Sequence, residues 1–90
     1  MSSTSKKHAS FVSEPMRRKP VTELPGIGKT AASHLQTRGY EESRDILGQY
    51  LVVKGDEQRF RDFVMSNAGA NSKSTGDCYR AMKEWTDNFL

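Results

Sequence analysis

Apolar residues recur along the chain at helical spacing, and no segment alternates between apolar and polar residues like a β-strand over any length. The pattern predicts short helices over about residues 5–13 and 20–24, and a third helix that resumes after residues 26–28 and continues to Thr37, with Gly39 as its terminator. A fourth helix is indicated by the apolar positions 46, 47, 50 and 51, and it ends at Gly55. The sequence therefore predicts an all-α protein.

Two further helices are predicted after that glycine. Asp56 is placed to cap the first of them, and Ser74 and Asp77 have the spacing of a capping box in the last one. The residues predicted to face the core in these two helices are Phe60, Phe63, Val64 and Ala68, followed by Cys78, Met82, Trp85 and Phe89. In the first predicted helix Phe11 and Val12 take this role, and residues 16–19 are predicted to form a basic loop.

Length and composition indicate one small domain that covers residues 1–90. Only 34% of the residues are hydrophobic and 28% are charged, so the core is thin and a second copy or a partner would help to stabilise it. Cys78 has no second cysteine to pair with, and no Cys/His cluster has the spacing of a zinc site. Neither a signal peptide nor a transmembrane run is evident. The composition thus predicts a soluble intracellular protein without a cofactor or membrane insertion.

The net charge of +3 is distributed unevenly along the chain. Residues 1–40 carry seven basic and two acidic side chains, a net charge of +5, whereas residues 41–90 carry seven basic and nine acidic side chains, a net charge of −2. A basic half on a small domain is the expected footprint of a polyanion partner, although solvated basic surface is also common. Charge alone leaves both interpretations open.

The most informative motif is LPGIGKTAASHL at residues 24–35, which fits a helix-hairpin-helix spanning about residues 20–37. Two helices reverse direction there within very few residues, so Gly26 and Gly28 are expected to adopt conformations that a Cβ would forbid. Ile27 between them is expected to plug the core. The small side chains of Ala31 and Ala32 would let the two helices approach closely.

This hairpin also predicts an anion-binding site. The backbone N–H groups of the hairpin and of the next helical turn are expected to point outward at the positive end of the helix dipole, where a DNA phosphate can bind. Lys29 at the tip adds a mobile positive charge. Such contacts position a protein on DNA without reading its sequence. The alternative is a plain helical hairpin, or a related fold used for protein contacts.

The chain as a whole resembles the barrier-to-autointegration factor family, small chromatin proteins of animals. The resemblance rests on segments spread over essentially all 90 residues, namely Lys7-His8, Phe11-Val12, Glu14-Pro15-Met16, Gly26-Ile27-Gly28, Leu47-Gly48-Gln49-Tyr50-Leu51, Asp56-Glu57, Gly69-Ala70-Asn71, Asp77-Cys78-Tyr79, Glu84-Trp85 and Phe89-Leu90. It implies a compact, SAM-like bundle of short helices and a symmetric homodimer with one site for double-stranded DNA on each outer face.

The same resemblance implies a role and a set of partners. A dimer of this kind can bridge two duplexes, compact DNA and link chromatin to LEM-domain proteins of the inner nuclear membrane. Histones or lamins are further partners to test. The implied location is the nucleus, at chromatin and the nuclear envelope, and also the cytoplasm.

Carried over residue by residue, the resemblance implies a DNA surface of two lysines and the hairpin backbone. Together with the residues indicated by the hairpin itself, the predicted DNA-binding set is Lys6, Lys7, Gly26, Ile27, Gly28, Lys29, His34 and Lys73. Lysines beside a dipole site can each neutralise a phosphate, which makes binding salt-sensitive. His34 stands where the family usually has a DNA-contacting lysine. Because imidazole is mostly neutral at pH 7, His34 either weakens that contact or has a structural role.

Gly48 is the predicted sign of assembly. A glycine inside a helix costs about 1 kcal/mol relative to alanine, and the family dimerises through this region, so close contact between protomers is the favoured reason over a kink. The resemblance implies that Tyr40, Leu51, Val52 and Lys54 belong to the surface that forms the groove for the LEM domain across the dimer. In a monomeric chain the same apolar positions would be core.

The N-terminus is a candidate for regulation. Ser3, Thr4 and Ser5 immediately precede two lysines and match a Ser/Thr cluster that kinases target in the family to release it from DNA. Each phosphate would add about −1.5 to −2 charge at pH 7. The alternative is an ordinary polar terminus.

An enzymatic function is not indicated. DNA glycosylases that contain this hairpin need a Gly/Pro-rich segment before a catalytic Asp, and the residues before Asp45 form no such loop. Glu41, Glu42 and Asp45 fit one exposed helical face better than a metal site.

The rival hypothesis is a protein-interaction paralogue that heterodimerises but has lost useful DNA binding. Two residues motivate this hypothesis, namely His34 and Gly55, which replaces a basic residue of the family. The basic segment of Arg17, Arg18 and Lys19 has two interpretations, either an added phosphate contact or a merely solubilising role.

Overall fold

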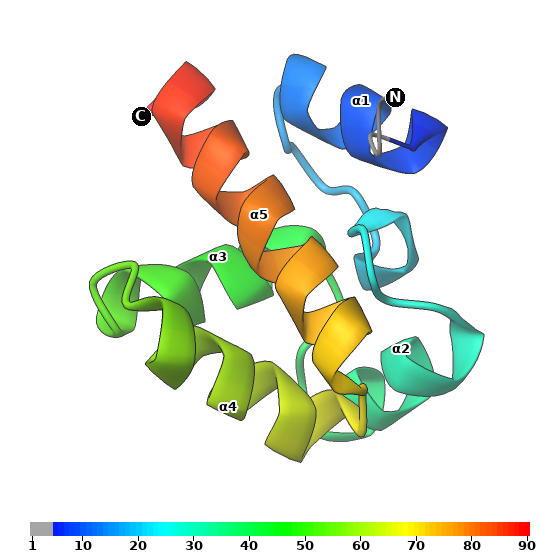
Figure 1. Ribbon diagram of the computed structural model, residues 1–90. Helices are drawn as coiled ribbons and strands as arrows, with labels where there is room; N and C mark the ends of the chain where they lie inside the picture. The colour runs from blue at the N-terminus through cyan, green and yellow to red at the C-terminus, as the bar shows by residue number, and fades with distance from the viewer. Residues whose placement is uncertain (1–4) are drawn as a thin grey trace.

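The computed structural model describes residues 5–90, and its regular elements are helices (Figure 1). They are α1 (Lys6–Ser13), the short 3-10 helix η1 (Val21–Glu23), α2 (Lys29–Thr37), α3 (Ser43–Val52), α4 (Glu57–Ala68) and α5 (Ser72–Phe89). Across this part of the chain, the pairing of Pro20 with Glu42 is an isolated β-bridge and no strand is formed. The prediction of an all-α fold is confirmed.

Several helix ends lie where the local sequence signals predict them. The Ser5 hydroxyl caps α1 by accepting the His8 N–H at 3.0 Å, and the Asp56 carboxylate caps α4 by accepting the Arg59 N–H at 2.9 Å. Gly39, with φ +93°, follows the end of α2 and takes the left-handed conformation that stops a helix. These boundaries depend on neighbouring residues only, which is why the sequence predicts them well.

Two predictions are wrong, namely the capping box of the last helix and the exposed acidic helical face. The last helix begins before Ser74, because Asn71 is its N-cap and the Asn71 Oδ1 accepts the Ser74 N–H at 2.8 Å. Asp77 therefore lies inside α5 and completes no capping box. The capping box is instead at α3, where Glu42 and Asp45 exchange hydrogen bonds with each other's backbone, so these two acids hold the helix start and do not form a free acidic face.

The long helix α5 organises the core. It packs against α1 and α4, while α2 packs against α4 and η1 contacts α2 and α3; Figure 1 shows α5 crossing the molecule between α1 and α4. Buried apolar residues from all of these elements form one cluster: Phe11, Val12, Met16, Val21, Leu24, Ile27, Ala32, Leu35, Ile46, Tyr50, Phe60, Val64, Ala68, Cys78, Ala81, Met82 and Trp85.

The structure differs from the predicted core at two positions. Met16, expected in a basic loop, is only 3% exposed and belongs to the core. Phe89, expected on the buried stripe of α5, is 39% exposed and stacks on Trp85 with ring centroids 5.1 Å apart. Of this pair, only the ring of Trp85 is buried. Among residues 5–90, no helix is long and apolar enough to cross a membrane.

Candidate nucleic-acid interface

A cleft of about 620 Å³ separates the start of α1 and the hairpin from the outer face of α5. Charged side chains dominate its walls, and its lining residues are Ser5, Lys7, His8, Pro25, Gly26, Lys73, Asp77, Arg80, Lys83, Glu84 and Asp87. Three residues predicted to bind DNA, namely Lys7, Gly26 and Lys73, thus come together although 66 residues separate the first from the last. The other predicted DNA-binding residues, namely Lys6, Ile27, Gly28, Lys29 and His34, are not among the lining residues.

Lys7 connects α1 to the hairpin. Its Nζ donates a hydrogen bond to the backbone carbonyl of Ile27 at 2.9 Å. Partial burial lowers the pKa of the Lys7 amine, and the opposing influences of Cys78 and Glu23 only partly offset this effect. An ammonium group has three donors, so Lys7 can hold the hairpin and still offer donors to an anion in the cleft.

The two glycines of the hairpin have different roles. Gly26 has φ +85°, and a Cβ on it would lie 2.2 Å from the backbone oxygen of Ser74 in α5. A side chain at this position would push the hairpin off α5. At Gly28 a Cβ would meet nothing within 4 Å, and its φ of −91° suits other residues. The expectation that both glycines are conformationally required holds for Gly26 and is wrong for Gly28.

The backbone around Gly28 leaves polar groups open. No side chain of the described chain caps α2, and the amides of its first turn, at Lys29, Thr30 and Ala31, have no partner among the backbone bonds of residues 5–90. Ile27 differs, because its N–H bonds to the Leu24 carbonyl at 3.0 Å and its side chain is buried. The open amides and the exposed Lys29 give α2 a positive N-terminal end, and the buried side chain of Ile27 anchors this end to the core.

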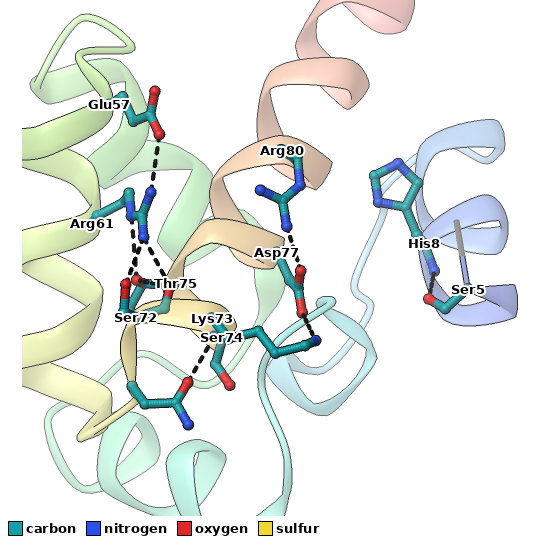
Figure 2. Close-up of polar contacts among 11 residues, drawn as sticks. Ser5, His8, Glu57, Arg61, Ser72, Lys73, Ser74, Thr75, Asp77 and Arg80 are labelled. Atoms are coloured by element: carbon teal, nitrogen blue, oxygen red, sulfur yellow. Dashed lines mark hydrogen bonds and ion pairs between the residues drawn. The ribbon is translucent and has the colours of Figure 1, made fainter. Parts of the chain in front are cut away.

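Lys73 and Arg80 share a carboxylate on α5 (Figure 2). Lys73 Nζ lies 3.1 Å from one oxygen of Asp77, and Arg80 Nη2 lies 2.5 Å from the other. Burial alone would raise the pKa of Asp77, but the hydrogen bonds and charges of Lys73 and Arg80 outweigh burial and lower it. Asp77 is therefore ionised near neutral pH and holds two cations at the edge of the cleft.

His34 has a structural contact. Its Nδ1 lies 3.0 Å from the carbonyl oxygen of Ala68, the last residue of α4, so this nitrogen carries the proton and donates it. A donor at that position satisfies a carbonyl that the helix leaves open at its C-terminus. The imidazole thus ties α2 to α4, and its other nitrogen remains on the exposed side.

A second group of predicted residues lies at the end of α3, away from the cleft. Leu51 and Val52 are 51% and 67% exposed, and Lys54 follows them in a left-handed conformation with φ +58°. At Gly48 a Cβ would meet nothing within 4 Å, so no packing inside the protomer requires glycine there. Tyr40 is separate from this apolar surface in its contacts, because it packs edge-on against Phe63 with ring centroids 5.3 Å apart.

The sequence also matches known proteins over its full length. A family described as barrier to autointegration factor matches residues 2–89. The chain belongs to the barrier-to-autointegration factor family. The chain is 47% identical over 90 residues to the barrier-to-autointegration factors of Danio rerio and Drosophila melanogaster, with full coverage of both chains in each case. It is 46% identical over 87 residues to the Homo sapiens protein, covering 97% of this chain and 98% of that one.

Membership in the barrier-to-autointegration factor family sets the general class of the protein. The family consists of non-enzymatic, DNA-binding proteins of nuclear chromatin with a SAM-like helical fold, and homodimers are general in it. The chain is thus a DNA-binding chromatin protein of this type and not an enzyme. Among residues 5–90 there is no cluster of three or more His, Cys, Asp or Glu side chains that could hold a metal ion.

Two departures from the barrier-to-autointegration factor pattern have local explanations. Gly55 has φ +71°, and a Cβ on it would lie 3.1 Å from the hydroxyl of Tyr50, so glycine fits the turn between α3 and α4 better than a basic residue. In the basic segment, Arg18 pairs with Glu42 at 3.1 Å and Lys19 contacts Glu14 and Glu23. These cations are partly neutralised by carboxylates of the same protomer.

Arg80 and Lys83, which line the cleft, were not predicted from the sequence, and neither was the pairing of His8 with Glu84 at 3.0 Å. Helical spacing from Lys73 carried the signal for Arg80, because positions seven apart lie on one helix face. Of the predicted phosphorylation sites, Ser3 and Thr4 lie outside the described residues. Ser5 is the N-cap of α1 and lines the cleft.

Proposed function

We propose that this protein is a homodimer that binds the phosphate backbone of double-stranded DNA without reading its sequence, and that bridges two duplexes. The observation that supports it best is the arrangement of Lys7, Gly26 and Lys73 around one cleft, beside the open amides of α2. Cations and outward-facing amides bind phosphates, and they carry no base-specific information. Bridging follows if two protomers associate through a surface that leaves each cleft free.

The half-buried Gly48, with the exposed Leu51 and Val52 close by in the chain, supports such a dimer, because this surface is apolar and contains none of the cleft-lining residues. Across the dimer, Tyr40, Leu51, Val52 and Lys54 are the residues that we propose for the groove of a LEM-domain partner, which would attach the dimer and its DNA to the nuclear envelope. Histones and lamins are further partners in this proposal, and the cytoplasm is a second location.

Phosphorylation of the N-terminus is proposed as the switch that releases DNA. Ser5 is described, and its position supports the idea, since a phosphate there would bring about −1.5 to −2 charge into the cleft that contains Lys7. The N-terminus of α1 would stabilise that phosphate, so the helix itself is expected to persist. Ser3 and Thr4 would add to the same negative charge.

The decisive experiment is a binding titration with random-sequence duplex DNA at several salt concentrations. We expect the affinity to be independent of sequence and to fall steeply with salt. Lys7→Gln and Lys73→Gln should each weaken binding to all duplexes and reduce the slope of log K against log salt by about 0.9. Arg59→Gln is the matched control, because Arg59 is an exposed cation outside the cleft and outside the α3 surface.

A second candidate is a paralogue that works through protein contacts, with weak or no DNA binding. Two observations favour this candidate. His34 is bonded to α4 and Lys73 is paired with Asp77, so each side chain already has a partner where it would need to contact a phosphate. Absence of any duplex binding by the wild-type protein at low salt would favour this candidate. Formation of a heterodimer with a family relative would then be its positive test.

A further inference from the structure

The outer face of α5 forms one wall of the cleft. Lys73, Asp77 and Arg80 have the spacing i, i+4 and i+7, which places all three on one side of the helix. The side chains of Lys73 and Arg80 are 85% and 62% exposed, and both line the cleft. A second cation thus lies two helical turns from Lys73, about 10 Å along the axis.

Gly76 lies next to the guanidinium group of Arg80. This glycine is buried within α5, and a Cβ on it would lie 3.3 Å from Arg80 Nη1 and 3.5 Å from Arg61 Nη2. Both guanidinium groups thus extend over the backbone of Gly76, Arg61 from α4 and Arg80 from the side that lines the cleft. Gly76 thus leaves room for both guanidinium groups beside α5, and even a methyl group here would require the end of Arg80 to shift slightly.

Arg61 and Arg80 differ in how far they are used within the protomer. Arg61 bonds to Glu57 at 3.1 Å and to the Ser72 carbonyl at 2.9 Å, so it joins α4 to the start of α5 (Figure 2). Within residues 5–90, Arg80 bonds to the Asp77 carboxylate alone. A guanidinium has five N–H donors, so most of those of Arg80 face the solvent of the cleft.

The Asp77 carboxylate pairs with both Lys73 and Arg80. Exposed ion pairs contribute little to stability, so Lys73 and Arg80 can exchange Asp77 for another anion at low cost. A duplex backbone presents a row of phosphates, and the guanidinium fork matches a phosphate with two parallel hydrogen bonds. The carboxylate, in turn, repels an incoming phosphate and competes with it for both side chains.

We propose that Arg80 is an additional DNA-phosphate contact, adjacent to Lys73 on α5, and that Asp77 weakens DNA binding by competing for both cations. This inference rests on the proposed function and deepens it. It adds a residue on α5 to the surface formed by α1, the hairpin and Lys73. The phosphate backbone would then follow α5 along the cleft.

The test is a titration of random-sequence duplex DNA at several salt concentrations with three single variants. Arg80→Ala should reduce the salt slope by about 0.9 and weaken binding about three- to tenfold at moderate salt. Asp77→Asn should tighten binding about two- to fivefold, since it removes a charge and keeps a side chain of the same shape. Arg44→Ala is the matched control, because Arg44 is also an exposed arginine paired with a carboxylate, Glu42, and does not line the cleft.

A double variant tests the competition itself. In the Arg80→Ala background, Asp77→Asn should give a smaller gain than in the wild type, because only Lys73 remains to be released. Circular dichroism should show unchanged helicity in every variant, since the altered side chains lie at the surface. If Arg80→Ala equals Arg44→Ala while Lys7→Gln weakens binding, the inference about Arg80 is overturned and the proposed function stands. If the wild-type protein binds no duplex, both fall together.

Discussion

The cleft face and the end of α3 differ in how complete they are within one protomer. At the cleft, Lys7 bonds to the hairpin and Asp77 bonds to Lys73 and Arg80. At the end of α3, the side chains of Leu51 and Val52 are largely exposed and apolar, so no ion pair fixes them within the protomer. The first face is arranged before any partner arrives, whereas the second exposes apolar surface that a partner would bury.

The two faces are therefore expected to gain their binding energy in different ways. The cleft would bind by exchanging ions at positions that already exist, so its affinity should depend on salt. The α3 surface would bind by burying apolar area, so its affinity should depend on shape and should tolerate salt. Substitutions on one face should leave the other face intact.

The largest expected effect is on the α3 surface. Gly48→Glu should place a charge in the dimer contact and cost several kcal/mol of association free energy. Because a Cβ at Gly48 meets nothing within 4 Å, the protomer itself should stay folded. Sedimentation should show a wild-type mass of twice 10.1 kDa and a folded monomer for the variant. Gln36→Glu, on the exposed side of α2, is the control, and a folded dimer of Gly48→Glu would place the interface elsewhere.

Next in size is a pair of substitutions that compares the two hairpin glycines. Gly26→Ala should lower the free energy of unfolding by about 1–3 kcal/mol from backbone strain, and more if the contact with Ser74 cannot relax. Gly28→Ala should change it by less, at most about 1 kcal/mol, because its surroundings are open and the expected cost is only that alanine is a poorer N-cap residue than glycine. Urea denaturation measures both. Equal effects of the two substitutions would contradict the different roles assigned to these glycines.

A smaller effect is expected where α2 meets α4. His34→Lys should add a cation near the hairpin and raise the salt slope of duplex binding by up to about 0.9. The same change removes the hydrogen bond to the Ala68 carbonyl and should lower the free energy of unfolding by about 1 kcal/mol. Gln36→Lys adds the same charge to α2 without breaking that bond. Unchanged stability of His34→Lys would show that the bond to Ala68 contributes nothing.

The smallest effect concerns the packing beneath the cleft. Burial raises the pKa of the Cys78 thiol to about 12 from an ordinary 9.0. The folded state thus favours the neutral thiol, so this group lowers the stability of the fold as pH rises from about 9 towards 12 and has no effect below that range. Alkylation of Cys78 at pH 8 should be slow in the native protein and fast in urea. Fast alkylation of the native dimer would mean that α5 opens beneath the cleft.

Helix positions could be predicted from the sequence because their causes are local. Gly39 and Asp56 end and begin helices through the conformation of their own backbone and of residues three away. The hairpin was predicted for the same reason. Where two local signals competed, as at Asn71 and Ser74, spacing alone selected the wrong helix start.

The tertiary structure decided which of these residues meet. Lys7 reaches Ile27, His34 reaches the end of α4, and the hairpin closes on α5 at Gly26, all contacts between segments far apart in the chain. No periodicity encodes such pairings, because they depend on how helices of given length and volume fill one core. The sequence by itself determined the helices and a candidate phosphate-binding hairpin. Packing decided that Gly26 is obligatory and Gly28 is not, and that the outer face of α5 lines one cleft together with Lys7 and the hairpin.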